Sequence, residues 1–208
     1  GQTCVAPDTV LLVGHAPEAF RAACAAAAIG APEGGLATDA AAARLDRLAA
    51  GLPTYALTPP GEGRRRPVSL VETPPGSALG REEIFGPVLA LTPVPDLAAA
   101  IAWIAARPSP LAIYLFGATR AEEAAVTAGT RSGAVVSGRT VEYVAFPALG
   151  FGGIGASGTG RYHGRRGFEE FSNLRAVVRH GRWSLSRLFD PPRTRFAQKL
   201  ISRLAGKR

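Results

Sequence analysis

Short runs of β-branched and aliphatic residues alternate along this sequence with alanine-rich stretches of helical length. The runs at 9–13, 67–72, 88–94, 111–116 and 133–136 have the length and composition of buried strands. Strands separated by helices along a chain favour parallel pairing, because the crossover needs a helix-sized connection. The alternation therefore predicts an α/β fold, with an open, mostly parallel sheet and flanking helices.

The sequence also predicts where the helices begin and end. Helices are predicted at 17–29 and 39–50, with Pro17 in the first turn of one and Gly51 just past the end of the other. A third is predicted at 97–106, where Asp96 is placed to cap it and Pro108 follows it. A fourth, of about ten residues, carries Glu122 and Glu123.

The last predicted helix, at 194–204, is amphipathic. Its apolar positions alternate at helical spacing with basic ones: Phe196, Leu200, Ile201 and Leu204, with Arg195, Lys199 and Arg203 between them. We expect this helix to cap a domain or to dock on a second subunit rather than to lie on a membrane. The pattern predicts a domain over 1–180 and a helical tail over 181–208.

Composition excludes several classes of protein. The chain has 208 residues, of which 47% are apolar, and this is enough for a real core. The net charge is +8, and 22 of the 24 basic residues are arginines, scattered except at 64–66, at 161–166 and in the tail. No aromatic residues interleave them as a stacking platform would need, so nucleic-acid binding is not predicted. The longest apolar run, 22–30, is too short to span a membrane. Two cysteines and no zinc spacing predict no disulfide framework, no metal site and a cytoplasmic location.

Cys4 lies in a loop of small residues, Gly-Gln-Thr-Cys-Val-Ala-Pro-Asp, directly before the first predicted strand. A thiolate in such a loop is a candidate nucleophile, because backbone N–H groups or nearby positive charge lower a thiol pKa from about 8.5. Cys24, inside the alanine-rich helix, is predicted to be a packing residue.

Two further segments attract attention. The acidic pair Glu82 and Glu83 opens Glu-Glu-Ile-Phe-Gly-Pro-Val, a loop that leads into a predicted buried strand. Glycines 153, 155 and 158 make a literal G-x-G-x-x-G, but no strand leads directly into it and no acidic residue follows at the expected distance, so it is not interpreted as a dinucleotide fingerprint. These glycines are expected to permit tight turns and close approach of the backbone, with the aromatic residues of 162–171 packing nearby.

Four segments in order, GQTCVAPD, EEIFGPV, GFGGIGASGTGRYHGRRGF and FSNLRAVV, resemble the C-terminal, catalytic part of an NAD(P)-dependent aldehyde dehydrogenase. The resemblance covers nearly the whole chain. The Tyr-His-Gly sequence and Pro191-Pro192 point to the branch that contains the class 3, fatty aldehyde and coniferyl aldehyde enzymes. The expected fold is the catalytic domain of that family over 1–180, without the N-terminal cofactor-binding domain.

The resemblance implies roles for individual residues. Cys4 matches the family's nucleophile, whose thiolate adds to the aldehyde carbon and whose backbone N–H stabilises the oxyanion. Glu83 matches the residue that binds the nicotinamide ribose, and Phe85 the aromatic residue that borders the nicotinamide ring of NAD or NADP. Phe151 falls at the loop near the substrate tunnel.

Two departures from the family bear on that tunnel. Gly150 stands where this branch usually has proline, and the 136–140 segment lacks the family's asparagine. In the family, the general-base glutamate, the oxyanion-hole asparagine and the Rossmann-type domain all come before the catalytic cysteine. Since Cys4 is the fourth residue and no methionine opens the sequence, we expect a fragment of a longer enzyme, and residues 174–179 are expected to be an unpaired edge.

The sequence leaves alternatives open. The cofactor half could be supplied separately or belong to a longer chain, in which case the site oxidises an aldehyde and the complete enzyme is expected to be a homodimer. Alternatively, the chain is a truncated, inactive fragment, or an interaction module that keeps the fold. A cysteine hydrolase would need Cys4 to pair with His15, His163 or His180, and no spacing in the sequence pairs them.

Overall fold

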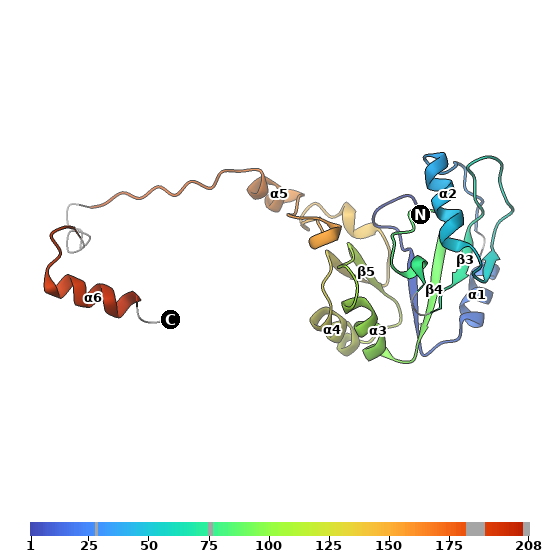
Figure 1. Ribbon diagram of the computed structural model, residues 1–208, viewed down its shortest axis with the longest axis horizontal. Coiled ribbons are helices and arrows are strands. Elements are labelled where there is room, and N and C mark those ends of the chain that lie inside the picture. The colour runs from blue at the N-terminus through green and yellow to red at the C-terminus, as the bar shows by residue number, and fades with distance from the viewer. Residues whose placement is uncertain (28, 75–76, 182–189, 206–208) are drawn as a thin grey trace. The chain divides into compact units, whose positions relative to one another are not determined.

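The computed structural model describes residues 1–27, 29–74, 77–181 and 190–205. The chain forms two compact units, Gly1–Ser172 and Asn173–Arg208. All described strands belong to the first unit (Figure 1). The predicted division into domains at residue 180 stays a prediction.

The first unit is built on a four-stranded sheet with the order β1-β4-β3-β2. Strands β1 (Thr9–Val13), β4 (Val88–Val94) and β3 (Ser69–Glu72) run parallel, and β2 (Thr54–Ala56) pairs antiparallel with β3. The central strands β3 and β4 are largely buried, which explains why the sequence shows them as apolar runs. The short edge strand β2 is fully exposed and has no such pattern, so the sequence did not predict it.

A second sheet has two strands, β5 (Ala112–Leu115) and β6 (Ala134–Ser137), which pair in parallel. Helix α4 (Arg120–Gly129) connects them along the chain. The expected α/β class with mostly parallel pairing is confirmed, but the expectation of one sheet is corrected to two. Periodicity identifies each strand, whereas pairing depends on contacts far along the chain, and no ladder joins β5 or β6 to the first sheet.

The helix predicted at 97–106 begins at the cap that the sequence predicts. Asp96 accepts a hydrogen bond from the Ala99 N–H and starts α3 (Leu97–Ala105). Thr119 and Glu122 form a reciprocal capping box on α4, and the hydrogen bonds from Thr119 lower the pKa of the Glu122 carboxyl. Helix α3 contacts helix α4 and, in the first sheet, strands β1 and β4.

Helices α1 (Pro17–Ala26) and α2 (Asp39–Ala49) belong to the first sheet's part of the unit. Helix α1 ends three residues earlier than predicted, because the backbone of Ala27 is already extended. The remaining turns of helix are short: η1 (Ala78–Gly80), η2 (Glu142–Ala145), η3 (Gly155–Ser157) and α5 (Gly164–Glu170).

Two apolar clusters hold the first sheet. The larger one packs α2 through Leu45 and Leu48 against strands β3 and β4 and against Leu79 and Ile84. The smaller one joins Leu12, Leu70 and Leu91, and Cys24 packs at its margin, as predicted. Burial raises the pKa of the Cys24 thiol, so this cysteine has the character of a packing residue.

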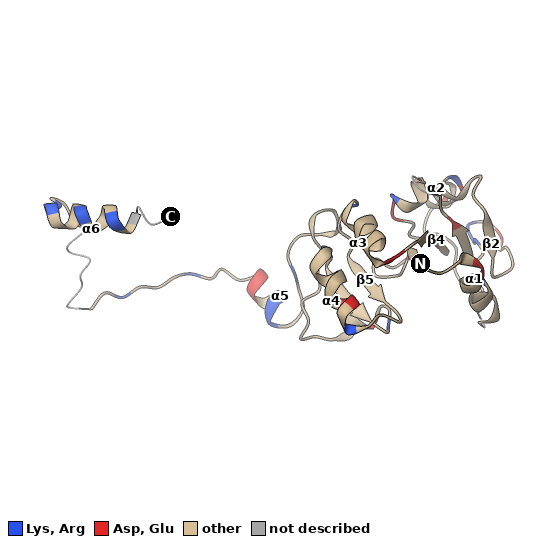
Figure 2. Cartoon of the chain, turned by 90° about the horizontal axis from the view of Figure 1, so that it is seen from below, with Lys and Arg blue, Asp and Glu red and all other residues tan. Residues whose placement is uncertain are grey.

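The second unit contains helix α6 (Arg195–Ala205). Its described charged residues are all basic (Figure 2). The preceding segment, 173–180, has no regular secondary structure and pairs with no described strand, and its Leu174, Val177 and Val178 are exposed. None of the helices in the described ranges is long and apolar enough to cross a membrane.

The core predicts a stability test. Leu91 is 0% exposed and lies on the central strand β4, whereas Leu174 is 77% exposed. We expect Leu91→Ala to lower the free energy of unfolding by about 3 kcal/mol through lost transfer energy and an unfilled cavity. The matched Leu174→Ala should change it by less than about 0.5 kcal/mol. Urea denaturation followed by circular dichroism measures both, and equal losses would contradict the described core.

Candidate active site

The pairing of β1 with β4 brings the cysteine loop and the acidic loop together. Cys4 precedes β1, and Glu83 and Phe85 precede β4. The two strands are parallel neighbours with Thr9 opposite Ala90, and the Ala90 N–H donates to the Asp8 carbonyl at 2.8 Å. The loop before β1 and the loop before β4 therefore lie next to each other at the same edge of the sheet.

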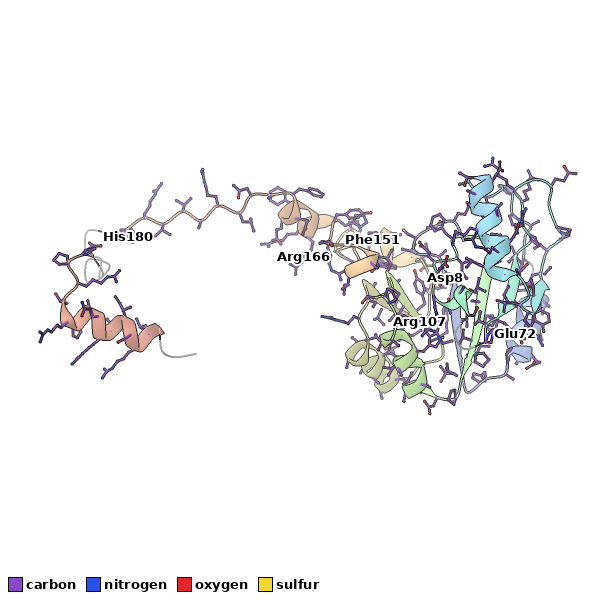
Figure 3. All side chains as sticks on the ribbon, in the orientation of Figure 1. Asp8, Glu72, Arg107, Phe151, Arg166 and His180 are labelled. Carbon is purple, nitrogen blue, oxygen red and sulfur yellow. The ribbon has the colours of Figure 1, made fainter. Side chains whose placement is uncertain are left out.

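Contacts between the two loops are direct. The Asp8 carboxylate, marked in Figure 3, accepts a hydrogen bond from the Ile84 N–H at 3.4 Å. Gly1 packs on Gly86 so closely that a Cβ on Gly1 would collide with the Gly86 carbonyl. Gln2 donates to the Gly35 carbonyl at 3.2 Å and accepts from the Ala37 N–H at 3.0 Å. The loop that carries Cys4 is therefore fixed on both sides.

Arg44 on α2 binds the backbone of the acidic loop. Its guanidinium donates to the carbonyls of Glu83 and Ile84, both at 2.7 Å. Phe85 adopts a left-handed backbone, with φ of 48°, which is uncommon for an aromatic residue. The Arg44 fork and the buried Ile84 side chain hold this conformation, and the Phe85 ring remains 39% exposed.

The chemistry of the two loop residues matches a sugar and a flat ring. Among the described residues, no hydrogen bond or ion pair engages the Glu83 carboxylate, so its oxygens can accept hydrogen bonds from a diol. The exposed Phe85 ring can pack against a planar heterocycle. These two side chains could hold the nicotinamide ribose end of a dinucleotide. No cluster of metal-ligating side chains occurs in the described part of the chain.

An aromatic cluster borders the other side of the Cys4 loop. Tyr114 on β5 donates its hydroxyl to the Val5 carbonyl at 2.6 Å, which ties the second sheet to the residue after Cys4. Tyr143 on η2 lies 6.4 Å from Tyr114 and 5.9 Å from Phe151, ring centre to ring centre. Phe151, labelled in Figure 3, in turn contacts Tyr162 and His163, at 5.3 and 5.8 Å between ring centres.

The glycine-rich segment forms the frame of this cluster. Phe151 and Tyr162 exchange two backbone hydrogen bonds, at 2.8 and 2.9 Å. A Cβ on Gly152 would collide with the Gly160 carbonyl, and one on Gly153 with the Ser157 carbonyl. The glycines thus permit close backbone approach, as predicted. No strand precedes G-x-G-x-x-G directly, and only the short η3 lies within it, which agrees with the rejection of a dinucleotide fingerprint.

Arg161 completes the frame from inside. Its guanidinium donates to the carbonyl of Gly133 at 2.8 Å and to those of Gly150 and Gly152 at 3.4 and 3.3 Å. The predicted packing of the aromatic residues holds for Tyr162 but is wrong for Phe168 and Phe171, which are 73% and 87% exposed. Both lie on or just after α5, and no element of the first unit covers the faces that carry them.

The site contains residues that the sequence did not single out. Arg44, Tyr114 and Tyr143 come from α2, β5 and η2, and none lies near Cys4 in the sequence. Nothing in the sequence marks them, because their roles depend on long-range packing. Conversely, no hydrogen bond pairs Cys4, which is exposed, with His15 or His163 in the described structure, so the hydrolase alternative gains no support.

Comparison with known proteins agrees with this architecture. The sequence pattern described as the aldehyde dehydrogenase family matches residues 1–177. The chain belongs to the aldehyde dehydrogenase family. This confirms the family that the four sequence segments predict, and the relatives include a probable coniferyl aldehyde dehydrogenase and a member of aldehyde dehydrogenase family 3, in agreement with the predicted branch.

Individual relatives define the extent of the match. A probable coniferyl aldehyde dehydrogenase from Pseudomonas aeruginosa is 34% identical over 98% of this chain, which covers 46% of that relative. A dimeric NADP-preferring aldehyde dehydrogenase from Rattus norvegicus is 41% identical over 54% of this chain and 25% of its own length. The structure of Staphylococcus aureus AldH in a substrate-bound state aligns over 100% of this chain and 48% of its own, with a TM-score of 0.76 and 26% identity. This aldehyde dehydrogenase chain thus spans less than half the length of these relatives.

The Arg44 fork predicts a local effect. Arg44→Ala removes two hydrogen bonds to the acidic loop, so amide hydrogen exchange in residues 83–86 should accelerate by about tenfold through easier local opening. Arg47→Ala on the same helix is the matched control, because the Arg47 side chain makes no hydrogen bond within the described residues. Exchange measured by mass spectrometry with unchanged rates in Arg44→Ala would contradict the role of the fork.

Proposed function

We propose that this chain provides the nucleophilic half of an NAD(P)-dependent aldehyde dehydrogenase that oxidises an aldehyde to a carboxylic acid. The observation that carries the proposal is the meeting of the Cys4 loop with the Glu83–Phe85 loop at one edge of the sheet. A nucleophile and a candidate nicotinamide-ribose site side by side suit a reaction in which a covalent adduct loses a hydride.

Cys4 is the proposed nucleophile. The thiolate sulfur forms a bond to the aldehyde carbon, and the carbonyl π electrons move to oxygen to give a thiohemiacetal anion. The Cys4 backbone N–H is the proposed hydrogen-bond donor to that oxygen. NAD⁺ or NADP⁺, when bound, supplies the acceptor for the hydride that leaves the same carbon. The product on Cys4 is a thioester, which water cleaves to the acid and the free thiol.

Glu83 and Phe85 are proposed to hold the nicotinamide ribose and to border the ring. The open carboxylate and the exposed ring support this assignment. In the enzymes of the family that this chain resembles, the general base, the oxyanion-hole asparagine and the Rossmann-type domain come before the catalytic cysteine in the sequence. We therefore propose that the active protein combines this chain with a part that supplies them, as a cytoplasmic homodimer. A truncated, inactive fragment or a binding module is the alternative.

Covalent chemistry at Cys4 is testable without turnover. A bound aldehyde should slow alkylation of Cys4 by iodoacetamide at pH 7, by about tenfold at ten times its dissociation constant. Cys4 and Cys24 lie in separate tryptic peptides, 1–21 and 22–44, so mass spectrometry reports both. 3-Phenylpropanal should protect Cys4 and not Cys24, and 3-phenylpropanol should protect neither. Equal alkylation of Cys4 with aldehyde and alcohol would sink the proposal.

The 208-residue chain alone should produce no NADH from benzaldehyde or a long-chain aldehyde. Hydride transfer needs a positioned nicotinamide, and thioester hydrolysis needs a general base, and we place the groups that provide both in the other part of the enzyme. Absorbance at the NADH band measures this directly. The comparison is the complete Pseudomonas relative under the same conditions, and steady NADH formation by the chain alone would overturn the prediction.

A further inference from the structure

A single peptide group closes the turn that carries Cys4. The Ala6 N–H donates to the Thr3 carbonyl at 2.9 Å. Cys4 and Val5 are the two residues between them, at the centre of the turn. The other end of the same peptide group, the Val5 carbonyl, accepts a hydrogen bond from the Tyr114 hydroxyl at 2.6 Å. The peptide group between Val5 and Ala6 is therefore bound at both ends.

The turn has a buried side and an open side. The Val5 side chain is 4% exposed, whereas Cys4 is exposed. Among the described residues, the bond from Tyr114 is the only side-chain hydrogen bond to the backbone of residues 3–6. Rotation of the turn would break this bond and leave a part-buried carbonyl without its partner. The orientation in which the turn presents Cys4 therefore depends on one tyrosine.

Tyr114 is held by a different part of the fold. It lies on β5, where the ladder to β6 places it opposite Val136, and its ring packs 6.4 Å from the ring of Tyr143, centre to centre. Burial raises the pKa of the Tyr114 hydroxyl, so this group stays protonated and can donate at neutral pH. The hydroxyl that binds the turn is therefore a fixed donor, supplied by the second sheet.

Two groups of the turn must face the same aldehyde in the proposed reaction. The Cys4 sulfur adds to the carbonyl carbon, and the Cys4 N–H donates to the oxygen that becomes an anion. Rotation of the turn changes the direction of this N–H relative to the carbonyl. Alkylation by a small reagent such as iodoacetamide uses the sulfur alone. Adduct formation is therefore more sensitive than alkylation to the orientation of the turn.

We propose that Tyr114 is a positioning residue for the reaction at Cys4. Its hydroxyl holds the Val5 carbonyl and thereby keeps the sulfur and the N–H of Cys4 directed at one aldehyde. Tyr114 acts through the backbone rather than on the substrate itself. The inference rests on the covalent chemistry proposed for Cys4 and deepens it, because it names the group on which the geometry of the nucleophile depends.

The test compares Tyr114→Phe with the unaltered 208-residue chain. The first readout is the concentration of 3-phenylpropanal that halves the rate of Cys4 alkylation by iodoacetamide. The second is the alkylation rate without aldehyde, from about pH 6 to about pH 9. We expect the halving concentration to rise about tenfold in Tyr114→Phe, because the turn is no longer held. The alkylation rates should stay within about twofold at each pH, because the thiol itself is unchanged.

Two further variants separate the hydroxyl from the ring. Tyr55→Phe removes a hydroxyl that makes no hydrogen bond within the described residues, on the exposed strand β2, and should change neither readout. 4-Aminophenylalanine in place of Tyr114 keeps a donor on the same ring, so it should return the halving concentration to within about threefold of the original. Cys24, at the margin of the smaller apolar cluster, reports the fold, and its alkylation should be equally slow in every variant.

The outcomes separate this inference from the proposed function. If 3-phenylpropanal fails to protect Cys4 in the unaltered chain, the covalent chemistry fails and the positioning role fails with it. If the same concentration protects the unaltered chain and Tyr114→Phe, the positioning role is overturned and the covalent chemistry stands. The role is also overturned if 4-aminophenylalanine restores nothing, or if Cys24 alkylation accelerates in Tyr114→Phe, which would make the tyrosine a purely structural residue.

Discussion

The parallel ladder between β1 and β4 is the constraint on which the rest of the site depends. These strands lie far apart in the sequence, yet Thr9 pairs with Ala90 and Val13 with Val94. Because parallel strands present the same ends to the same edge, the loop before β1 and the loop before β4 must meet. A shift of pairing partner would separate Cys4 from Glu83 and Phe85, whatever the local structure of either loop.

The second sheet contributes the wall on the other side of Cys4. It has no ladder to the first sheet, and its link to the cysteine loop is the Tyr114 hydroxyl on the Val5 carbonyl. The glycine-rich segment then needs its small residues, because Gly133 and Gly152 are in backbone contact and Arg161 binds the carbonyls around them. Through these carbonyls, Arg161 supports the backbone on both sides of Phe151.

The family match and the geometry of the site are two separate observations, and they agree. The family pattern extends to residue 177, and the chain covers 46% of its Pseudomonas relative and 48% of Staphylococcus aureus AldH. The described residues of this family member include the cysteine loop, the acidic loop and the aromatic cluster. The described contacts explain how these three remain assembled within one compact unit, through Asp8, Arg44 and Tyr114.

The sequence by itself determined the local elements and the chemistry they could carry. Strands β1 and β4 and the cap at Asp96 follow from periodicity and capping rules, which act over a few residues. Tertiary structure alone decided that the strands form two sheets, that β2 exists, and that Arg44 and Tyr114 border the site. Those features depend on contacts between residues from thirteen to more than a hundred positions apart, and no short-range pattern records such contacts.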